Sequence, residues 1–247
     1  MTMKLTFDMA RKEVSSGIYP KEVIASNKKT GWSILDNVPQ LTCYGACPIR
    51  HKCYDVKLLK IRPTVLRARA RRHFMMEMAP DKYVEQVVKE IVARNATKVR
   101  IYGGGDFAPH HYDILVKILR TLPKITFYMI SKTIREYPMH AIALLEFPNF
   151  FLNISECKDY LFGEGWEEFR VHPRVNFVYT LLPDDGDYET VKRADIVFNV
   201  SRRAKDIAVY KMCGIAMCPC DAHDMPAEGA CGKCGLCSTK GGVRCAN

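Results

Sequence analysis

The chain carries eleven cysteines, and three of them stand close together at positions 43, 47 and 53. Thiolates this close in sequence either form disulfides or bind a metal, and the two outcomes imply different chemistry. Three cysteines cannot complete a four-ligand zinc site alone, but they can hold three irons of a cubane iron–sulfur cluster and leave the fourth iron open. The alternatives for Cys43, Cys47 and Cys53 are a zinc site completed by His51 and buried thiols without metal.

A second group, Cys231, Cys234 and Cys237, has the short spacing of ferredoxin-type ligands. A remote fourth ligand is available from Cys218 or Cys220. Four thiolates suit zinc and an iron–sulfur cluster equally, so this group predicts a metal without identifying it.

Three observations favour metal binding over disulfides. Residues 1–30 show no secretory signal, which is typical of a cytoplasmic protein that keeps its thiols reduced. The cysteine count is odd, and a chain of this length with 48% hydrophobic residues can bury a sizeable core without covalent staples. No stretch of about 18 apolar residues is present, so we also expect no membrane span.

The net charge of +10 is concentrated partly in residues 62–73, close to the first cysteine group. Such a basic stripe favours a polyanionic partner such as nucleic acid, although a solvated helix face has the same composition. The stripe consists of Arg62, Arg67, Arg69, Arg71, Arg72 and His73.

These groups need a scaffold, and the pattern from residue 98 onward predicts alternating strands and helices. This alternation implies an α/β fold with a parallel sheet and crossover helices, a partial or complete parallel β/α barrel whose site lies at the carboxyl ends of the strands. Residues 1–30 look polar and irregular, and helices are expected over 64–78 and 81–95. The expected strands are 98–102, 125–131, 150–155, 176–182 and 195–200, with further helices over 112–122 and 135–146.

The periodicity stops near residue 212, where glycine, proline and cysteine dominate. A tail of this size cannot build its own hydrophobic core, so bound metal is expected to order it. We therefore predict a β/α barrel-like domain over residues 1–211 and a cysteine-rich metal-binding segment over residues 212–247.

Three consecutive glycines and an aspartate follow the strand expected at 98–102; they are Gly103, Gly104, Gly105 and Asp106. Glycines at the carboxyl end of a strand let a ligand reach the backbone, and a carboxylate beside them suits an ammonium group or a sugar hydroxyl. The alternative is a tight turn in which Asp106 caps the next helix.

Polar residues also end several other expected strands, where a β/α barrel binds its ligands. Ser131 and Lys132 end one strand, Asn153 lies near the end of the next, and Asn199 and Arg202 lie at the last. Arg202 could pair with a carboxylate or a phosphate. Each residue alone is consistent with a strand-end cap, whereas together they would form a polar ring at one mouth of the barrel.

A three-cysteine loop and a Gly-Gly-acid turn after the next strand resemble the radical S-adenosylmethionine enzymes. The resemblance implies that Cys43, Cys47 and Cys53 bind a 4Fe–4S cluster and that the turn ending in Asp106 contacts S-adenosylmethionine. Two departures are the gap of five residues before Cys53, where that family has two, and an aspartate in place of the usual glutamate.

In more detail, the chain resembles a set of phage-encoded proteins with a three-cysteine loop, a Gly-Asp-Phe turn and a C-terminal cysteine group. The matching segments here are Thr42–Tyr54, Gly105–Phe107 and Cys231–Cys237. For a phage-encoded protein, the expected location is the cytoplasm of the host cell.

The resemblance implies that a reduced cluster passes an electron to S-adenosylmethionine and releases a radical that abstracts hydrogen from a substrate. Nucleic acid or a nucleotide-derived molecule is the substrate that the basic stripe favours. The resemblance further implies an electron donor such as flavodoxin or ferredoxin, and a second 4Fe–4S cluster or zinc in the C-terminal group. Asp106 and Arg202 are the candidate catalytic residues.

Two other functions are consistent with the residues. A zinc enzyme similar to the tRNA-guanine transglycosylases would exchange guanine for a 7-deazaguanine in DNA or RNA, with Asp106 or Asp159 as nucleophile or base. That function leaves the first cysteine loop without a role. A non-catalytic zinc module that binds nucleic acid would use both cysteine groups structurally, but it does not need an exposed glycine turn.

Overall fold

The computed structural model of the chain describes residues 3–27, 31–43, 47, 53–157, 161, 163–181, 191, 194–199, 217–218 and 234–239. For Tyr54, Glu164 and Asn199 it describes the backbone alone.

The described strands form one mostly parallel sheet of seven strands whose spatial order follows the chain order. The first two strands pair antiparallel, and every later pair is parallel. The α/β class is therefore confirmed, but the described strands form an open sheet, because β1 and β7 are its two edges. The strands are β1 (Ala25–Asn27), β2 (Gly31–Ile34), β3 (Lys98–Ile101), β4 (Thr126–Ser131), β5 (Phe150–Glu156), β6 (Val175–Leu181) and β7 (Ile196–Asn199).

Prolines set the start of several helices. Pro63, Pro80 and Pro138 each stand in the first turn, where the missing N–H costs nothing. The helix expected over 135–146 therefore begins only at Pro138, after a separate 3-10 turn. The α-helices are α1 (Met3–Ser15), α2 (Pro39–Thr42), α3 (Tyr54–Ile61), α4 (Pro63–Met78), α5 (Pro80–Ala93), α6 (Tyr112–Thr121) and α7 (Pro138–Leu145). The 3-10 turns are η2 (Pro109–His111), η3 (Thr133–Glu136), η4 (Glu164–Val171) and η5 (Leu236–Ser238). None of these described helices has the length and apolar character that a membrane crossing requires.

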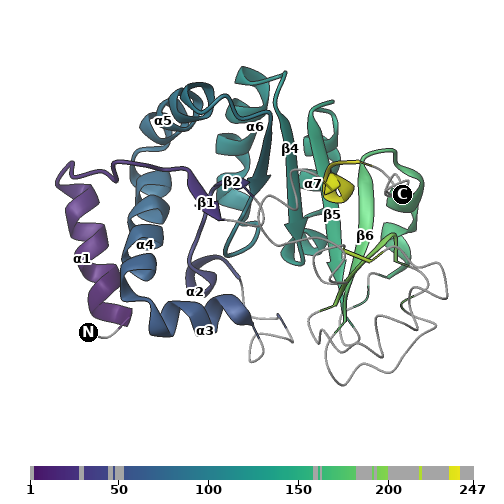
Figure 1. Cartoon of the computed structure of the whole chain (residues 1–247), viewed down its shortest axis with the longest axis horizontal. Helices are drawn as coiled ribbons and strands as arrows, with labels where there is room; N and C mark the ends of the chain where they lie inside the picture. Colours follow the sequence, from purple (N-terminus) through teal and green to yellow (C-terminus); the bar gives the residue numbers. More distant parts are fainter. Residues whose placement is uncertain are drawn as a thin grey trace.

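The prediction that residues 1–30 are irregular is wrong, because they contain α1 and β1. The buried stripe of α1 is made of Thr6, Ala10 and Val14, which are small or polar and hide the helical period from a hydrophobicity pattern. Small side chains let α1 pack closely along α4, and Figure 1 shows the two helices side by side at the far end from β6.

The two faces of the sheet differ in polarity because successive side chains point to opposite sides. One face is apolar and joins α5, α6 and α7 in the main core, as the burial of Val87, Ile118 and Leu144 shows. The strand residues on that face include Val99, Ile101, Phe127, Met129, Leu152, Ile154, Val175 and Phe177. Residues of the opposite face, called the polar face below, include Lys98, Arg100, Tyr128, Asn153, Ser155, Asn176 and Thr180.

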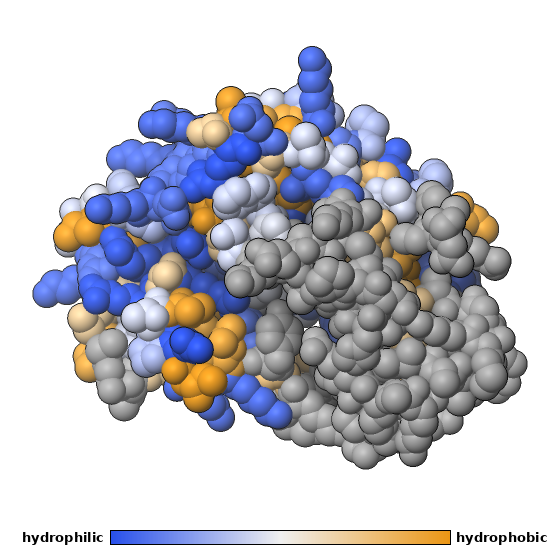
Figure 2. All heavy atoms as spheres, in the orientation of Figure 1, coloured by the Kyte–Doolittle hydropathy of each residue, from blue (hydrophilic) through white to orange (hydrophobic). Residues whose placement is uncertain are grey.

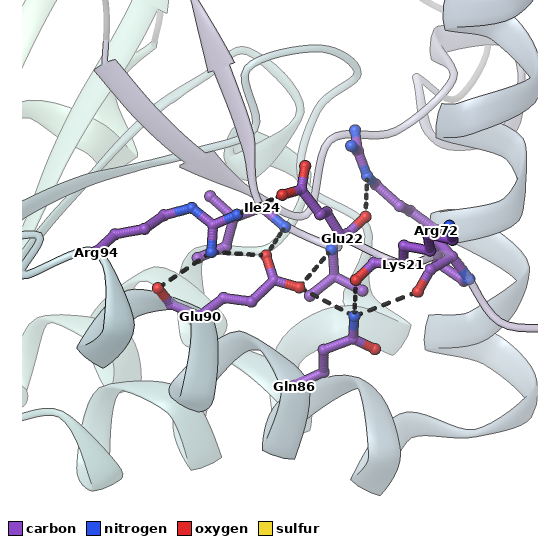
Figure 3. A network of polar contacts seen from close by, with 9 residues as sticks. Lys21, Glu22, Ile24, Arg72, Gln86, Glu90 and Arg94 are labelled. Atoms are coloured by element: carbon purple, nitrogen blue, oxygen red, sulfur yellow. Dashed lines mark hydrogen bonds and ion pairs between the residues drawn. The ribbon is translucent and has the colours of Figure 1, made fainter.

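A buried carboxylate fastens the segment before β1 to α5 (Figure 3). Glu90 is 8% exposed and accepts hydrogen bonds from the backbone N–H groups of Val23 (2.9 Å) and Ile24 (3.2 Å). Gln86 donates to Glu90 at 3.0 Å, and Arg94 forms ion pairs with Glu90 (3.3 Å) and Glu22 (2.8 Å). These contacts fix the hairpin from which β2 enters the sheet.

Candidate functional site at the strand ends

Buried polar residues meet at the carboxyl ends of β2, β3, β4 and β5. Parallel strands bring these ends to one edge of the sheet, which is where ligands bind in sheets of this kind. The residues are Asp36 and Asn37 after β2, Asp106 after β3, Ser131, Lys132 and Thr133 around the end of β4, and Ser155 and Glu156 at the end of β5.

The first cysteine group lies beside this edge, between α2 and α3. Cys43 ends α2, where its N–H donates to the carbonyl of Pro39 at 2.9 Å, and Cys53 is the residue before the first turn of α3. Cys43, Cys47 and Cys53 are all half-buried. Cys43 and Cys53 are thiols and form no disulfide. Of the residues between them only Cys47 is described, and the alternative ligand His51 lies outside the described residues.

The Cys43 thiol has a strongly raised pKa. Burial is the largest cause, and the negative charges of Asp106, Cys47, Cys53 and Asp55 add to it. Hydrogen bonds place two of the cysteines beside the glycine turn. The Asp106 N–H donates to Thr42 Oγ1, next to Cys43, at 3.4 Å, and the Gly105 N–H donates to Asp55 Oδ2, two residues after Cys53, at 3.3 Å. A bound cation would reverse the rise in the thiol pKa, since a coordinating thiol is held as thiolate.

These residues suit an iron–sulfur cluster by the chemistry of their side chains. Among the described residues, no three His, Cys, Asp or Glu side chains are arranged as a preformed metal site. The three thiols are the soft donors that iron–sulfur clusters take, and the buried carboxylates Asp55 and Asp106 belong to the segments that border them. Asn37, after β2, is a further residue suited to contact a ligand. Its side-chain amide is fully buried, and neither of its polar atoms has a hydrogen bond within the protein.

Asp106 joins the ends of β3 and β4. Its Oδ1 accepts hydrogen bonds from the Phe107 N–H (2.7 Å) and the Ser131 hydroxyl (2.5 Å), and its Oδ2 accepts from the N–H groups of Lys132 (3.0 Å) and Thr133 (3.3 Å). Asp106 therefore does not cap the next helix. The four donors hold the carboxylate in one orientation, and the same bonds fix Ser131, which was expected to contact a ligand.

The glycine turn packs against protein groups. A Cβ on Gly103 would lie 2.3 Å from Asp36 Oδ1, and one on Gly104 would lie 2.1 Å from Arg69 Nη1. The Gly104 N–H donates to Asp36 Oδ1 (3.2 Å), and its carbonyl accepts from the Asn37 N–H (2.9 Å). Gly105 needs to be glycine for its positive φ of 76° as well. The turn therefore requires glycine for its own packing, and the contacts of Gly104 are made inside the protein.

Lys132 is a buried cation on the polar face. It is 9% exposed, and its ammonium group donates to Ser155 Oγ (2.6 Å) and to the Glu156 carbonyl (3.4 Å). Ser155 in turn shares a hydrogen bond with Thr180 at 3.3 Å. Burial lowers the pKa of Lys132, while nearby Cys157, Cys47, Asp106 and Glu156 act in the opposite direction. A buried ammonium group held by neutral oxygens can neutralise an incoming anion.

Residues 234–239, which carry Cys234 and Cys237 of the C-terminal group, lie on the polar face. Asn153 donates to the carbonyl of Cys237 (2.8 Å), and Asn176 donates to that of Thr239 (2.9 Å) and to Asn153 Oδ1 (3.1 Å). Cys234 and Cys237 pack against Val178, Ile196 and Leu236. Asn153, which was expected near a strand end, lies in the middle of β5 and holds the segment that carries Cys237.

The remaining predicted residues lie at or beyond β7. Cys218 follows Met217, which forms an isolated bridge with Val197 of β7, and the Cys218 N–H donates to the carbonyl of Val197 at 2.8 Å. Asn199 ends β7, and only its backbone is described. Arg202, Cys220 and Cys231 lie outside the described residues.

The family model of gene product 88 matches residues 19–240, a span that holds both cysteine groups, the glycine turn and the whole sheet. The chain belongs to the gene product 88 family. No curated protein matches the chain, and no solved structure matches it.

In this member of the gene product 88 family, most residues of the basic stripe form ion pairs or hydrogen bonds with other residues of the same chain. Arg67 and Arg71 pair with Glu13 of α1, Arg69 pairs with Asp55, and His73 contacts Glu77 at 3.1 Å. Arg72 donates to the carbonyl of Glu22 at 3.2 Å. Figure 2 shows hydrophilic side chains over the region of α1 and α4, and three arginines of the stripe, Arg67, Arg69 and Arg71, form ion pairs with α1 or α3.

Sequence reasoning missed Asp36, Asn37, Asp55 and the inward role of Arg69. Asp36 and Asn37 directly follow the short apolar run at 31–35, so a strand-end position was the available signal for them. Asp55 and Arg69 gave no local signal, because their contacts join residues far apart in sequence.

Proposed function

We propose that the chain is an iron–sulfur enzyme of the radical S-adenosylmethionine type, which reductively cleaves S-adenosylmethionine to modify a nucleic acid or a nucleotide-derived molecule. The observation that carries the proposal is the position of Cys43 and Cys53 beside the glycine turn that follows β3. Thr42, next to Cys43, accepts a hydrogen bond from the Asp106 N–H (3.4 Å), and Asp55, two residues after Cys53, accepts one from the Gly105 N–H (3.3 Å). An open-sided cluster needs three thiolates at such a strand end and a surface beside it for a second ligand.

The arrangement of the sheet supports this function. Consecutive parallel strands joined by right-handed crossovers place their helices on one face and leave the other face free to curve inward. The apolar face is covered by helices, and the opposite face carries Lys98, Lys132, Asn153 and Ser155. We therefore regard the open sheet as a partial β/α barrel whose polar face is its interior.

Each residue has a defined task in the proposal. Cys43, Cys47 and Cys53 would hold a 4Fe–4S cluster, which when bound supplies the electron that cleaves S-adenosylmethionine. Asp106 is a positioning residue that keeps the ends of β3 and β4 together. Lys132 would bind an anionic group of the ligand with its buried ammonium group.

The C-terminal group would hold the second metal, either a 4Fe–4S cluster or zinc. Cys218, Cys231, Cys234 and Cys237 supply the thiolates, and Asn153 fixes the segment that carries two of them. A flavodoxin or ferredoxin would supply the electron, in the cytoplasm of a host cell.

The transglycosylase alternative has less support. A nucleophilic carboxylate needs an oxygen open to the substrate, whereas both oxygens of Asp106 accept hydrogen bonds from the protein. Asp159 lies outside the described residues. A nucleic-acid-binding module without catalysis would give no role to the buried ammonium group of Lys132 at the strand ends.

Anaerobic reconstitution with iron and sulfide tests the proposal. The wild-type protein is expected to gain the visible absorption of an iron–sulfur cluster and, with a reductant, to cleave S-adenosylmethionine. Cys43→Ala, Cys47→Ala and Cys53→Ala should each lose the cleavage, whereas the buried Cys157→Ala serves as the matched control and should retain it. Cleavage that survives in all three cysteine variants would exclude the proposal.

A further inference from the structure

We propose that Asp55 and Arg69 form a buried positioning pair that fixes the glycine turn against the cysteine loop and sets the charge around the cluster-binding thiols. This inference rests on the proposed function for its charge effect. The positioning effect concerns the protein without a cluster and can be measured separately.

Asp55 connects the three parts of the site. It lies in the first turn of α3, two residues after Cys53, and is 3% exposed. Its Oδ1 pairs with the guanidinium group of Arg69 on α4, and its Oδ2 accepts a hydrogen bond from the Gly105 N–H at 3.3 Å. One carboxylate therefore holds the cysteine-bearing end of α3, the middle of α4 and the glycine turn together.

Arg69 lies directly against the turn. A Cβ on Gly104 would stand 2.1 Å from Arg69 Nη1, 2.5 Å from Cζ and 2.8 Å from Nη2, so the whole guanidinium group faces the Gly104 backbone. The side chain of Arg69 is 11% exposed, which leaves it little contact with solvent. A planar fork is suited to this place because it can cover the peptide and still reach Asp55.

The pair also contributes to the net charge beside the cysteine loop. Asp55 stands two residues after Cys53, and the Asp106 N–H donates to Thr42 Oγ1, next to Cys43, at 3.4 Å, so each carboxylate lies beside a cysteine of the loop. Asp106 is held by neutral donors only, whereas Asp55 has a formal cation beside it. Arg69 is thus the residue that offsets one of the two carboxylates. Charges beside a cluster shift its reduction potential, because each added negative charge disfavours the reduced form.

A double-mutant cycle on the reconstituted protein tests the charge effect. The reduction potential of the first cluster is measured in the wild type, Asp55→Asn, Arg69→Gln and the double variant, all with Cys234→Ala and Cys237→Ala to remove the second cysteine group. Asp55→Asn should shift the potential to more positive values and Arg69→Gln to more negative values. The double variant should lie close to the wild type, because it removes a neutral pair.

Arg67→Gln is the matched control, since Arg67 is on the same helix but pairs with Glu13 of α1. It should leave the potential unchanged. Shifts that are absent, or that have the same sign in Asp55→Asn and Arg69→Gln, would overturn the charge effect.

Amide hydrogen exchange in the protein without a cluster tests the positioning effect. This measurement also applies to variants that take up no iron. Exchange over residues 103–106 should be faster in Arg69→Gln than in Arg67→Gln. Equal exchange in the two variants would refute the positioning role. A wild-type protein that binds no iron would sink the proposed function while leaving this comparison valid.

Discussion

At the scale of the residue, the site is defined by charged groups that are buried and held by neutral partners. Asp106 accepts hydrogen bonds from three backbone N–H groups and one hydroxyl, and Lys132 donates to a hydroxyl and a carbonyl. Neutral partners orient a charge without cancelling it, so both groups can still act electrostatically on a ligand. The two residues differ in their capacity to bind a ligand. Both oxygens of Asp106 already accept hydrogen bonds, whereas the ammonium group of Lys132 has no carboxylate at hydrogen-bond distance.

Asp106→Asn should lower the free energy of unfolding by about 1–3 kcal/mol, because an amide NH₂ would face backbone donors that have no other acceptor. Urea denaturation measures the loss. Asp113→Asn, an exposed position on α6, makes the same chemical change and should lie within about 0.5 kcal/mol of the wild type. Equal stability of the two variants would show that Asp106 does not join the strand ends.

Lys132→Met should leave the free energy of unfolding unchanged or raise it, because a buried ammonium group costs solvation that a methionine does not. Burial lowers the pKa of Lys132 in the folded protein, so the unfolded chain binds the proton more tightly. The wild type therefore gains stability as pH rises toward the unfolded value of about 10.4 and loses it as pH falls through the folded value.

Denaturation at several alkaline pH values measures the difference between the wild type and Lys132→Met. The gap between them should narrow as the pH rises. A gap that widens with pH would contradict the lowered pKa of Lys132.

At the scale of the element, α5 and the 3-10 turn η2 support the site from outside it. Glu90 of α5 fastens the segment before β1, and His111 of η2 reaches the hydroxyl of Tyr102, the residue just before the glycine turn, at 3.1 Å. Tyr102 has a positive φ of 60°, which is unusual for a residue with a side chain. The turn is therefore held by η2 as well as by α4.

Glu90→Ala should lower the free energy of unfolding by at least about 2 kcal/mol, because the N–H groups of Val23 and Ile24 lose their acceptor. Amide exchange at Val23 and Ile24 should rise in the same variant. Glu85→Ala, on the exposed side of α5, is the control and should change neither measurement. If the two variants behave alike, Glu90 does not clamp the segment.

The histidines around η2 should make stability depend on pH. Burial lowers the pKa of both His110 and His111, and the His73 ring stands 6.1 Å from that of His111 between centroids. Because the folded values lie below the unfolded value of about 6.5, stability is fully present above that pH and is lost as pH falls through the folded values.

Thermal unfolding between neutral and mildly acidic pH measures this dependence. His111→Asn removes one titrating ring and should flatten the fall relative to the wild type. An identical fall in both proteins would assign the pH dependence to other groups.

At the scale of the whole molecule, the sequence predicts the sheet well and the contacts of the site poorly. The expected strands at 125–131, 150–155 and 176–182 overlap β4, β5 and β6, because apolar runs between helical segments are a local signal. Helix α1 escapes prediction because its buried residues are small or polar, and β1 because it has only three residues, too few for a pattern. Asp36 and Arg69 meet the glycine turn across more than thirty residues of chain, and no local pattern records such a contact.

Metal analysis of oxygen-protected protein tests most directly what Cys43, Cys47 and Cys53 bind. Iron, acid-labile sulfide and zinc should be measured on freshly purified wild type and on Cys47→Ala. We predict iron and sulfide in the wild type and a clear loss of both in Cys47→Ala. Zinc as the only metal, or iron that is equal in the two proteins, would contradict the account.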